Sequence, residues 1–341
     1  MPQHSTTDPA VSAAAYDAAR HRAAFTDRSH RGRIVVSGAD RASYLQGLLT
    51  NDVVALKAGE GCYSAYLTPQ GRMIADLDVY ELGDVMLLTM SGDVKDAVLA
   101  KLDQFIFSED VQLGDTTASF AEVAVIGPDA ARSVARAFGG AVSEAQMAAL
   151  PEHGNVRADW RGGAAIVARI ADAGEKGFAV FVEAAAKEAF VAALADAGAA
   201  PLDDRTADAI RIEGGVPLFH RDMDEDTIPL EAGIEPRAIS LTKGCYVGQE
   251  VIIRVLHRGH GRVAKKLAGL SIDGNGVPAE GTTVVSGDRE IGRVTSSTWS
   301  PALERPIALA YVHRDFVEPG TKVSVDGAPA EVTTLPFVGR E

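Results

Sequence analysis

The chain has 341 residues, of which 46% are hydrophobic and 23% charged. This is the composition of a globular protein and excludes a disordered or fibrous chain, and at about 150 residues per domain the length suggests two or three domains. The 33 Lys and Arg residues against 47 Asp and Glu residues give a net charge of −14. So acidic a protein is not expected to wrap duplex DNA over its whole surface, because phosphate contacts need clustered cations.

The two cysteines, Cys62 and Cys245, are too few for a disulfide framework or a four-cysteine zinc site, and they suit a reducing compartment. No stretch approaches the about 18 apolar residues that cross a membrane. Residues 1–20 form a polar tail without the apolar core of a signal peptide. We therefore expect a cytoplasmic protein with no membrane partner and no direct contact to duplex DNA.

The first strong pattern is a β-branched run over residues 32–37 that stops at Gly38 and is followed by Asp40 and an apolar-periodic helix. The same arrangement recurs about 89 residues later, at residues 123–138. The two units suggest internally related α+β halves. The alternative remains open that strand-to-helix turns use Gly and Asp in general.

Further strands and helices follow the first unit. Short turns after residues 62–68 and 73–81 predict antiparallel hairpins that also include residues 85–90. The later elements are a helix over 94–107, a hairpin of 164–170 and 177–182, a helix over 184–197 and a helix ending at 207–212.

From residue 262 onward, short strands alternate with Gly and Pro turns, which predicts a small β-barrel or jelly roll. The predicted fold class is therefore α+β, with antiparallel sheets and a C-terminal β-barrel. We divide the chain into the tail of residues 1–20, an α+β body of two lobes interleaved in sequence over 21–258, and the barrel over 259–341.

Two acidic residues lie on one face of the strand predicted over residues 73–81. Strand alternation places Asp76 and Asp78 on the same side as Ile74. The ordinary expectation for such a polar side is solvent. A carboxylate that lined a cavity instead could hold a cationic or N–H-bearing ligand.

The most unusual stretch is Lys-Gly-Cys-Tyr-Val-Gly-Gln-Glu at residues 243–250, which we call the octet. A neighbouring ammonium lowers the pKa of a thiol, and glycines allow a backbone to approach a ligand closely. Cys245 is therefore a candidate reactive thiol. The alternative is a structural cysteine in a turn.

A cationic strip over residues 254–266 follows the octet and contains five Lys and Arg residues and two histidines. It suits an anion such as a carboxylate tail or a phosphate backbone, and it also suits a solvated linker between domains. His257 and His260 could bind a metal together with Cys245, but this residue set is unspecific, and we assign no metal site.

The octet, with supporting segments, resembles the folate-binding superfamily of the glycine-cleavage T-protein (aminomethyltransferase). Its Lys-Gly-Cys-x-x-Gly-Gln-Glu pattern matches the YgfZ branch, whose members assist iron–sulfur assembly and tRNA modification. The supporting segments are residues 27–29, 50–53, 71–80, 211–213, 228–231, 292–296 and 311–312.

The resemblance implies a three-lobed, ring-like fold around a channel that holds tetrahydrofolate or a one-carbon derivative. It implies that the protein is an accessory factor in maturation or repair of [4Fe-4S] proteins, with iron–sulfur assembly or client proteins and tRNA-modification enzymes as partners. Cys245 and Asp76 are then the catalytic candidates. The residues expected to bind the cofactor are Asn51, Arg72, Asp76, Arg211, Lys243, Gly244, Tyr246, Gly248, Gln249, Glu250 and Arg254.

Two other functions remain open from the same residues. Asp76 matches the catalytic aspartate of the T-protein, which implies a folate-dependent aminomethyl or methyl transferase instead. In that alignment Ala179 and Ala207 stand where the pterin-contacting glutamate and its arginine partner would be, which implies an altered folate site. The third hypothesis is a scaffold that uses the cationic strip to bind RNA or a protein.

Overall fold

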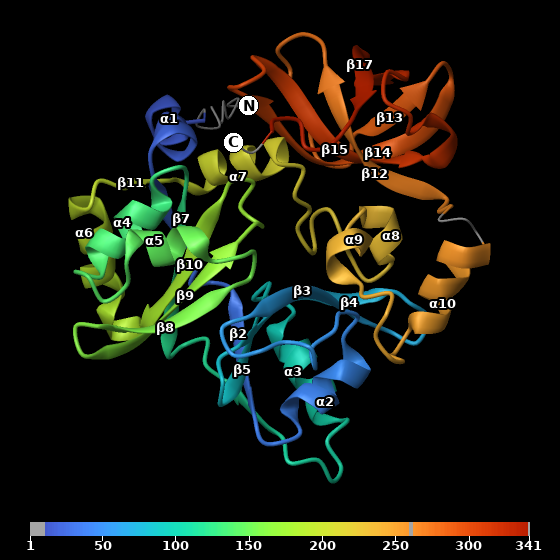
Figure 1. Ribbon diagram of the computed structural model, residues 1–341. Coiled ribbons are helices and arrows are strands. Elements are labelled where there is room, and N and C mark those ends of the chain that lie inside the picture. Colours follow the sequence, from blue (N-terminus) through green and yellow to red (C-terminus); the bar gives the residue numbers. More distant parts are fainter. Residues whose placement is uncertain (1–10, 259–261, 340–341) are drawn as a thin grey trace, which may run out of the picture.

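The computed structural model describes residues 11–258 and 262–339. Three lobes surround a central region, and the short helices α8 and α9 lie between the first lobe and the barrel (Figure 1). Within the described residues, no helix is both long and apolar enough to cross a membrane.

The first lobe is a five-stranded antiparallel sheet in the order β3-β4-β5-β2-β6. The predicted hairpins between β3 and β4 and between β4 and β5 are confirmed. The elements of this lobe are β2 (Gly32–Ser37), α2 (Arg41–Leu48), β3 (Gly61–Leu67), β4 (Met73–Glu81), β5 (Val85–Met90), α3 (Lys95–Asp103) and β6 (Gln112–Asp115).

The second lobe is a six-stranded sheet in the order β11-β1-β7-β10-β9-β8. Because β1 precedes the whole first lobe in the chain, the two lobes are interleaved in sequence. Its elements are α1 (Ala13–His21), β1 (Ala24–Asp27), β7 (Phe120–Ile126), α4 (Ala130–Ala137), α5 (Glu144–Ala149), β8 (Asn155–Trp160), β9 (Gly163–Ile170), β10 (Gly177–Glu183), the 3-10 turn η1 (Ala184–Ala186), α6 (Lys187–Asp196), β11 (Ala200–Pro201) and α7 (Asp204–Glu213).

The two lobes share the arrangement of four strands. The order β3-β4-β5-β2 in the first sheet corresponds to β8-β9-β10-β7 in the second, while the next strand differs, since β6 follows β5 in the chain and β1 precedes β7. The turn after each unit's first strand has the same geometry, with φ of 104° at Gly38 and 108° at Gly127. A Cβ at Gly38 would lie 2.0 Å from the carbonyl oxygen of Asp110, so only glycine fits there. The repeated sequence pattern therefore reflects a repeated fold.

The third lobe is a closed six-stranded barrel in the order β12-β15-β14-β13-β16-β17, as expected from the alternating strands and turns. Its apolar interior forms a separate core. Its elements are β12 (Lys265–Ile272), β13 (Thr283–Ser286), β14 (Arg289–Ser300), β15 (Arg305–His313), the 3-10 turn η3 (Arg314–Phe316), β16 (Lys322–Val325) and β17 (Ala328–Thr333). The α+β fold with a C-terminal β-barrel is confirmed.

Short helices connect the second lobe to the barrel and cover the first lobe. They are α8 (Pro229–Ala232), α9 (Glu235–Ala238), α10 (Gln249–Ile253) and the π-helix η2 (Arg254–Arg258). Side chains from this connection, including Leu230, Ala238 and Ile252, belong to the same hydrophobic core as the first sheet. The cationic strip thus begins as helix, and its residues 259–261 lie outside the described part of the chain.

Candidate functional site

A cavity of about 140 Å³ lies against β4, and Asp76 and Asp78 of that strand line it. Its lining also contains apolar residues, among them Phe219 and Ile234. Asp78 is only 5% exposed. The solvent-facing orientation expected from strand alternation alone is therefore wrong, because the second lobe and the segment before α8 cover this face of the sheet.

Asp76 is held at the cavity wall by one side chain of the neighbouring strand. The hydroxyl of Tyr63 donates a hydrogen bond to Oδ2 of Asp76 over 2.8 Å. Burial raises the pKa of Asp76, and the charge of Asp78 adds to this, while the Tyr63 hydrogen bond and the charge of Arg31 lower it. The net pKa is raised, so Asp76 is a desolvated carboxyl and a strong hydrogen-bond acceptor when ionised.

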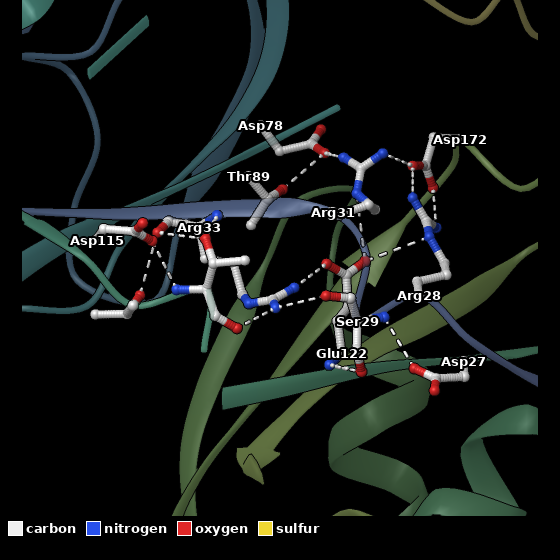
Figure 2. A network of polar contacts seen from close by, with 12 residues as sticks. Asp27, Arg28, Ser29, Arg31, Arg33, Asp78, Thr89, Asp115, Glu122 and Asp172 are labelled. Atoms are coloured by element: carbon white, nitrogen blue, oxygen red, sulfur yellow. Dashed lines mark hydrogen bonds and ion pairs between the residues drawn. The ribbon is translucent and has the colours of Figure 1, made fainter. Parts of the chain in front are cut away.

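Asp78 connects the cavity to a buried ionic network. The Nη2 of Arg31 lies 3.4 Å from Oδ2 of Asp78, and the hydroxyl of Thr89 donates to the same oxygen over 3.3 Å. Arg31 lies between Asp78 and Asp172 in Figure 2. Since Asp172 follows β9, the network joins the strand that carries Asp76 to the second lobe.

The same network continues along the boundary of the two lobes. Arg28 forms two hydrogen bonds with Asp172 and an ion pair of 3.3 Å with Glu122. Arg33 of β2 is fully buried and lies 3.6 Å from Glu122 of β7 (Figure 2). Three arginines thus face two carboxylates of the second lobe and Asp78 of the first, and this pairing is what makes their burial tolerable.

A second cavity of about 810 Å³ adjoins the first. Ala207 and Arg211 of α7 line it, as do Ser297 and Thr298 of the barrel. Residues of all three lobes therefore line this pair of neighbouring cavities. The residues that line both cavities are His30, Arg31, Asp172 and Leu218.

Of the predicted cofactor-binding residues, Asp76 and Arg211 line these cavities, whereas Asn51 and Arg72 do not. The Nδ2 of Asn51 donates to the backbone carbonyls of Tyr63 and Arg237, so it positions two cavity residues. Arg211 is buried and lines the larger cavity, where its side chain also bonds barrel and loop side chains. Arg72 is half-exposed and pairs with Asp226 at the end of the β3–β4 turn.

In the octet, the side chains of Lys243 and Tyr246 stabilise the fold. The Nζ of Lys243 donates to the backbone carbonyls at the end of α2, those of Gln46, Leu49 and Asn51, over 2.6, 2.6 and 2.8 Å. Burial lowers the pKa of Lys243 to about 8, so the ammonium persists at neutral pH. Tyr246 is buried in the core of the first lobe.

The glycines of the octet differ in their surroundings. Gly248 has a φ of 86°, and a Cβ there would lie 2.5 Å from the carbonyl oxygen of Thr68. It packs against Gly71 in the β3–β4 turn, whose own Cβ would meet Val251 at 2.9 Å. Gly244 is exposed, with no atom within 4 Å of a built Cβ.

The remaining octet residues and Arg254 lie toward the surface. Cys245 is exposed, and within the described residues it has no hydrogen bond or ion pair. Gln249 and Glu250 begin α10, and Arg254 begins η2 and is exposed. No octet residue lines either of the cavities beside Asp76.

A metal centre was not predicted, although His257, His260 and Cys245 were considered. His260 lies outside the described residues. Within residues 11–258 and 262–339, no group of three or more His, Cys, Asp or Glu side chains is arranged to hold a metal ion.

Sequence reasoning missed His153, Arg237 and the buried arginines of the network. His153 stands in a turn and Arg237 in the four-residue helix α9, neither within a recognisable pattern, and only the folded chain brings them to the cavity beside β4. The spacing of Arg28, Arg31 and Arg33 was a usable signal, because cations so dense around a predicted strand need buried acidic partners if the strand is in the core.

Models of two protein families match the sequence of the chain. The model of the GCVT N-terminal domain matches residues 3–243. That of the glycine cleavage T-protein C-terminal barrel domain matches residues 265–338.

Curated relatives with the same name align along nearly the whole chain. An aminomethyltransferase of Rubrobacter xylanophilus is 35% identical over 96% of this chain and 86% of its own length. One from Listeria monocytogenes is 32% identical over 96% of this chain and 90% of its own length. In structure, the chain resembles the glycine cleavage system aminomethyltransferase T from Bartonella henselae, with a TM-score of 0.86 at 23% identity, over 95% of this chain and 89% of that one.

These findings overturn the main function expected from the sequence. The relatives are named aminomethyltransferase, so the accessory role in [4Fe-4S] protein maturation is wrong, and the iron–sulfur and tRNA-modification partners fall with it. The expected membership of the YgfZ branch depended on the sequence pattern of the octet. Its Lys243 and Gly248 have structural contacts that account for these residue types without any role in cluster chemistry.

Proposed function

The chain belongs to the aminomethyltransferase family of glycine-cleavage T-proteins, and from this membership we propose that it is a folate-dependent one-carbon transferase acting at Asp76. The observation that carries the proposal is the position of Asp76. Its carboxyl lies desolvated on the wall of a cavity at the junction of the lobes, and Tyr63 holds one of its oxygens.

The space beside Asp76 suits tetrahydrofolate, the ligand expected from the sequence. Pockets for ligands of this size measure about 300–1,000 Å³; the larger cavity, of about 810 Å³, falls in that range, and the smaller one, of about 140 Å³, adjoins it. A narrow inner end with Phe219 and Ile234 opposite two carboxyls fits a flat ring that carries N–H groups. The wider outer part would accept the rest of the ligand.

We infer that polar recognition of the ring relies on Asp76, Tyr63 and the ends of the ionic network. Ala179 lies in the interior of β10 and is 1% exposed, so it offers no polar group. Ala207 lines the larger cavity and offers only a methyl group. This arrangement supports an altered folate site of the kind expected from the sequence.

Asp76 would act by position and charge. Its ionised carboxylate accepts a hydrogen bond from a ring N–H and orients the neighbouring nitrogen toward the donor's one-carbon group. As that group is transferred, positive charge develops next to a carboxylate held in a low-dielectric wall, which stabilises the transition state. Tetrahydrofolate supplies the nucleophilic nitrogen that receives the carbon.

The test is turnover with tetrahydrofolate and a panel of one-carbon donors, namely free amines, thioethers and an aminomethylated lipoyl protein. The expected result is formation of a one-carbon folate with at least one donor by the wild-type chain, and its loss in Asp76→Asn. Binding of tetrahydrofolate without turnover on any donor would refute the transferase function.

A further inference from the structure

We propose that His153, which the second lobe contributes, is a positioning residue that keeps Asp78 ionised and thereby sets the proton affinity of Asp76. The inference rests on the proposed function, because it assigns to the same site a device that controls its catalytic carboxyl. In this proposal the two cavity-lining carboxyls of β4 have different roles: Asp78 carries a charge, and Asp76 contacts the ligand.

His153 is placed at β4 by a loop of the second lobe that docks on the first. Its backbone N–H donates to the carbonyl of Arg169, and the following Asn155 bonds the carbonyls of Gly59 and Glu60. The side chain is only 10% exposed. The contact between lobes therefore fixes where this imidazole lies.

The backbone of His153 has a φ of 59°, in the left-handed region that non-glycine residues rarely adopt. Such a conformation persists only where surrounding contacts impose it, and residues of this kind gather at functional sites. An asparagine or glycine would fit the turn at less cost, so the backbone does not account for the imidazole. The presence of an imidazole at this position therefore has to be explained by the contacts of the His153 side chain.

Both ring nitrogens of His153 face carboxylates. Nδ1 lies 3.5 Å from Oδ1 of Asp78, and Nε2 lies 3.3 Å from Oε1 of Glu152. Nδ1 has no closer hydrogen-bond partner in the described structure. An imidazole between two carboxylates is favoured in its doubly protonated, cationic form.

Burial lowers the pKa of His153, but the hydrogen bond with Glu152 and the charge of Asp78 outweigh burial and leave it raised. The pKa of Asp78 is also raised, because burial outweighs the charges of His153, Arg31 and Arg28, which lower it, and the charge of Asp172 raises it further. The cation and the buried carboxylate therefore support one another's charged forms.

The surrounding charges decide which carboxyl depends on His153. Around the imidazole stand Glu152, Arg237, Asp172 and the ring of Tyr80. Around Asp78 stand Arg28, Arg31, Asp172, Asp76 and the hydroxyl of Thr89. Arg28 and Arg31 are shared with Asp172 and Glu122, and His153 adds a further positive charge whose Nδ1 lies 3.5 Å from Oδ1 of Asp78.

An ionised Asp78 acts on Asp76 two residues along the strand. The two side chains are about 7 Å apart by strand geometry, and like charges at this distance in a buried site raise each other's pKa. A higher pKa makes the Asp76 carboxylate a stronger acceptor for a ligand N–H. The contact between the lobes is thus linked to the chemistry at Asp76 through the side chains of His153 and Asp78.

The experiment measures the pKa of the Asp76 carboxyl by carbon-13 NMR in the free protein, and the pH profile of turnover beside it. The variants are Asp78→Asn, His153→Asn, which suits the left-handed backbone, and the double variant. His220→Asn is the matched control. His220 also has a positive φ, of 63°, and also lies between two carboxylates, Asp93 and Glu225, but it lines neither cavity.

We expect the pKa of Asp76 to fall by about one unit in Asp78→Asn and about half a unit in His153→Asn, since Asp78 is protonated more readily when Arg28 and Arg31 remain as its cationic neighbours and the charge of His153 is lost. The double variant should match Asp78→Asn alone, and His220→Asn should match wild type. The acidic limb of the pH profile should move to lower pH by the same amounts.

An unchanged Asp76 pKa in Asp78→Asn or in His153→Asn, or a double variant in which the two shifts add, would overturn the inference. If His153→Asn does not fold, NMR titration of the His153 imidazole in the wild type and in the near-isosteric Asp78→Asn replaces it, and an unchanged His153 pKa in Asp78→Asn would overturn the inference. Absence of turnover in every protein, with the carboxyl shifts present, would refute the transferase function and leave the control of Asp76 by Asp78 and His153 standing.

Discussion

The octet and the Asp76 cavity contrast in how sequence relates to chemistry. The octet is the most unusual stretch of the chain, yet its Lys243 caps three carbonyls and its Gly248 allows two turns to pack. The segment around Asp76 reads as an ordinary strand. In the fold it lines a cavity with charged side chains from two lobes.

The difference shows that an unusual motif can reflect a demanding backbone contact as well as a reactive group. A buried ammonium on three carbonyls and a glycine with positive φ restrict sequence as strongly as catalysis does. A catalytic carboxyl needs only a strand, a cavity and desolvation, none of which leaves a conspicuous local pattern. The contrast predicts that substitution of Asp76 lowers turnover, and that substitution of Lys243 or Gly248 in the octet lowers stability.

The largest effect is expected for Asp76→Asn. Turnover should fall by at least about 100-fold, because the charge that stabilises the transition state is removed. Thermal stability should stay equal or rise, since a neutral amide replaces a carboxyl whose burial is costly. Steady-state assays check the expected loss of turnover, and calorimetric unfolding checks the expected stability. A loss of stability parallel to the loss of activity would contradict a catalytic role.

Lys243→Met should destabilise the protein without disabling the site. Removing the ammonium leaves the carbonyls of Gln46, Leu49 and Asn51 without this donor, which we expect to lower the free energy of unfolding by about 2–4 kcal/mol. Urea unfolding measures this, with the exposed Lys57→Met as control at less than about 0.5 kcal/mol. A loss of tetrahydrofolate affinity at full stability would instead make Lys243 a ligand contact.

Alanine substitutions of the two octet glycines should differ in their cost in unfolding free energy, because the two glycines differ in packing. Gly248→Ala should cost about 1–3 kcal/mol of unfolding free energy, because its φ is positive and a Cβ would strike the carbonyl of Thr68. Gly244→Ala should be nearly neutral, since its Cβ would point into open space. Equal costs at both positions in the same unfolding experiment would contradict this packing account.

The smallest effect is expected for Cys245→Ser. The thiol is exposed and lines neither cavity, so turnover should change by less than about twofold and stability by less than about 0.5 kcal/mol. A tenfold loss of turnover at unchanged stability would restore Cys245 as a reactive thiol and weaken the contrast.

The fold was predictable wherever the determinants are local. The units at Gly38 and Gly127, the hairpins around β4 and the barrel strands follow from turn residues and alternation. The site was predictable only in part. Strand alternation placed Asp76 and Asp78 on one face, but the burial of that face depends on the other lobe. His153 is 75 residues from Asp78 in the sequence and lies beside it only in the folded chain.

The measurement that tests the central claim most directly is isothermal titration of tetrahydrofolate into the wild type, Asp76→Asn and Cys245→Ser. We predict one binding site per chain in the wild type, affinity at least about tenfold weaker in Asp76→Asn, where a charged hydrogen bond is lost, and unchanged affinity in Cys245→Ser. Equal affinity of the wild type and Asp76→Asn, with binding lost in Cys245→Ser, would place the ligand at the octet and contradict the account.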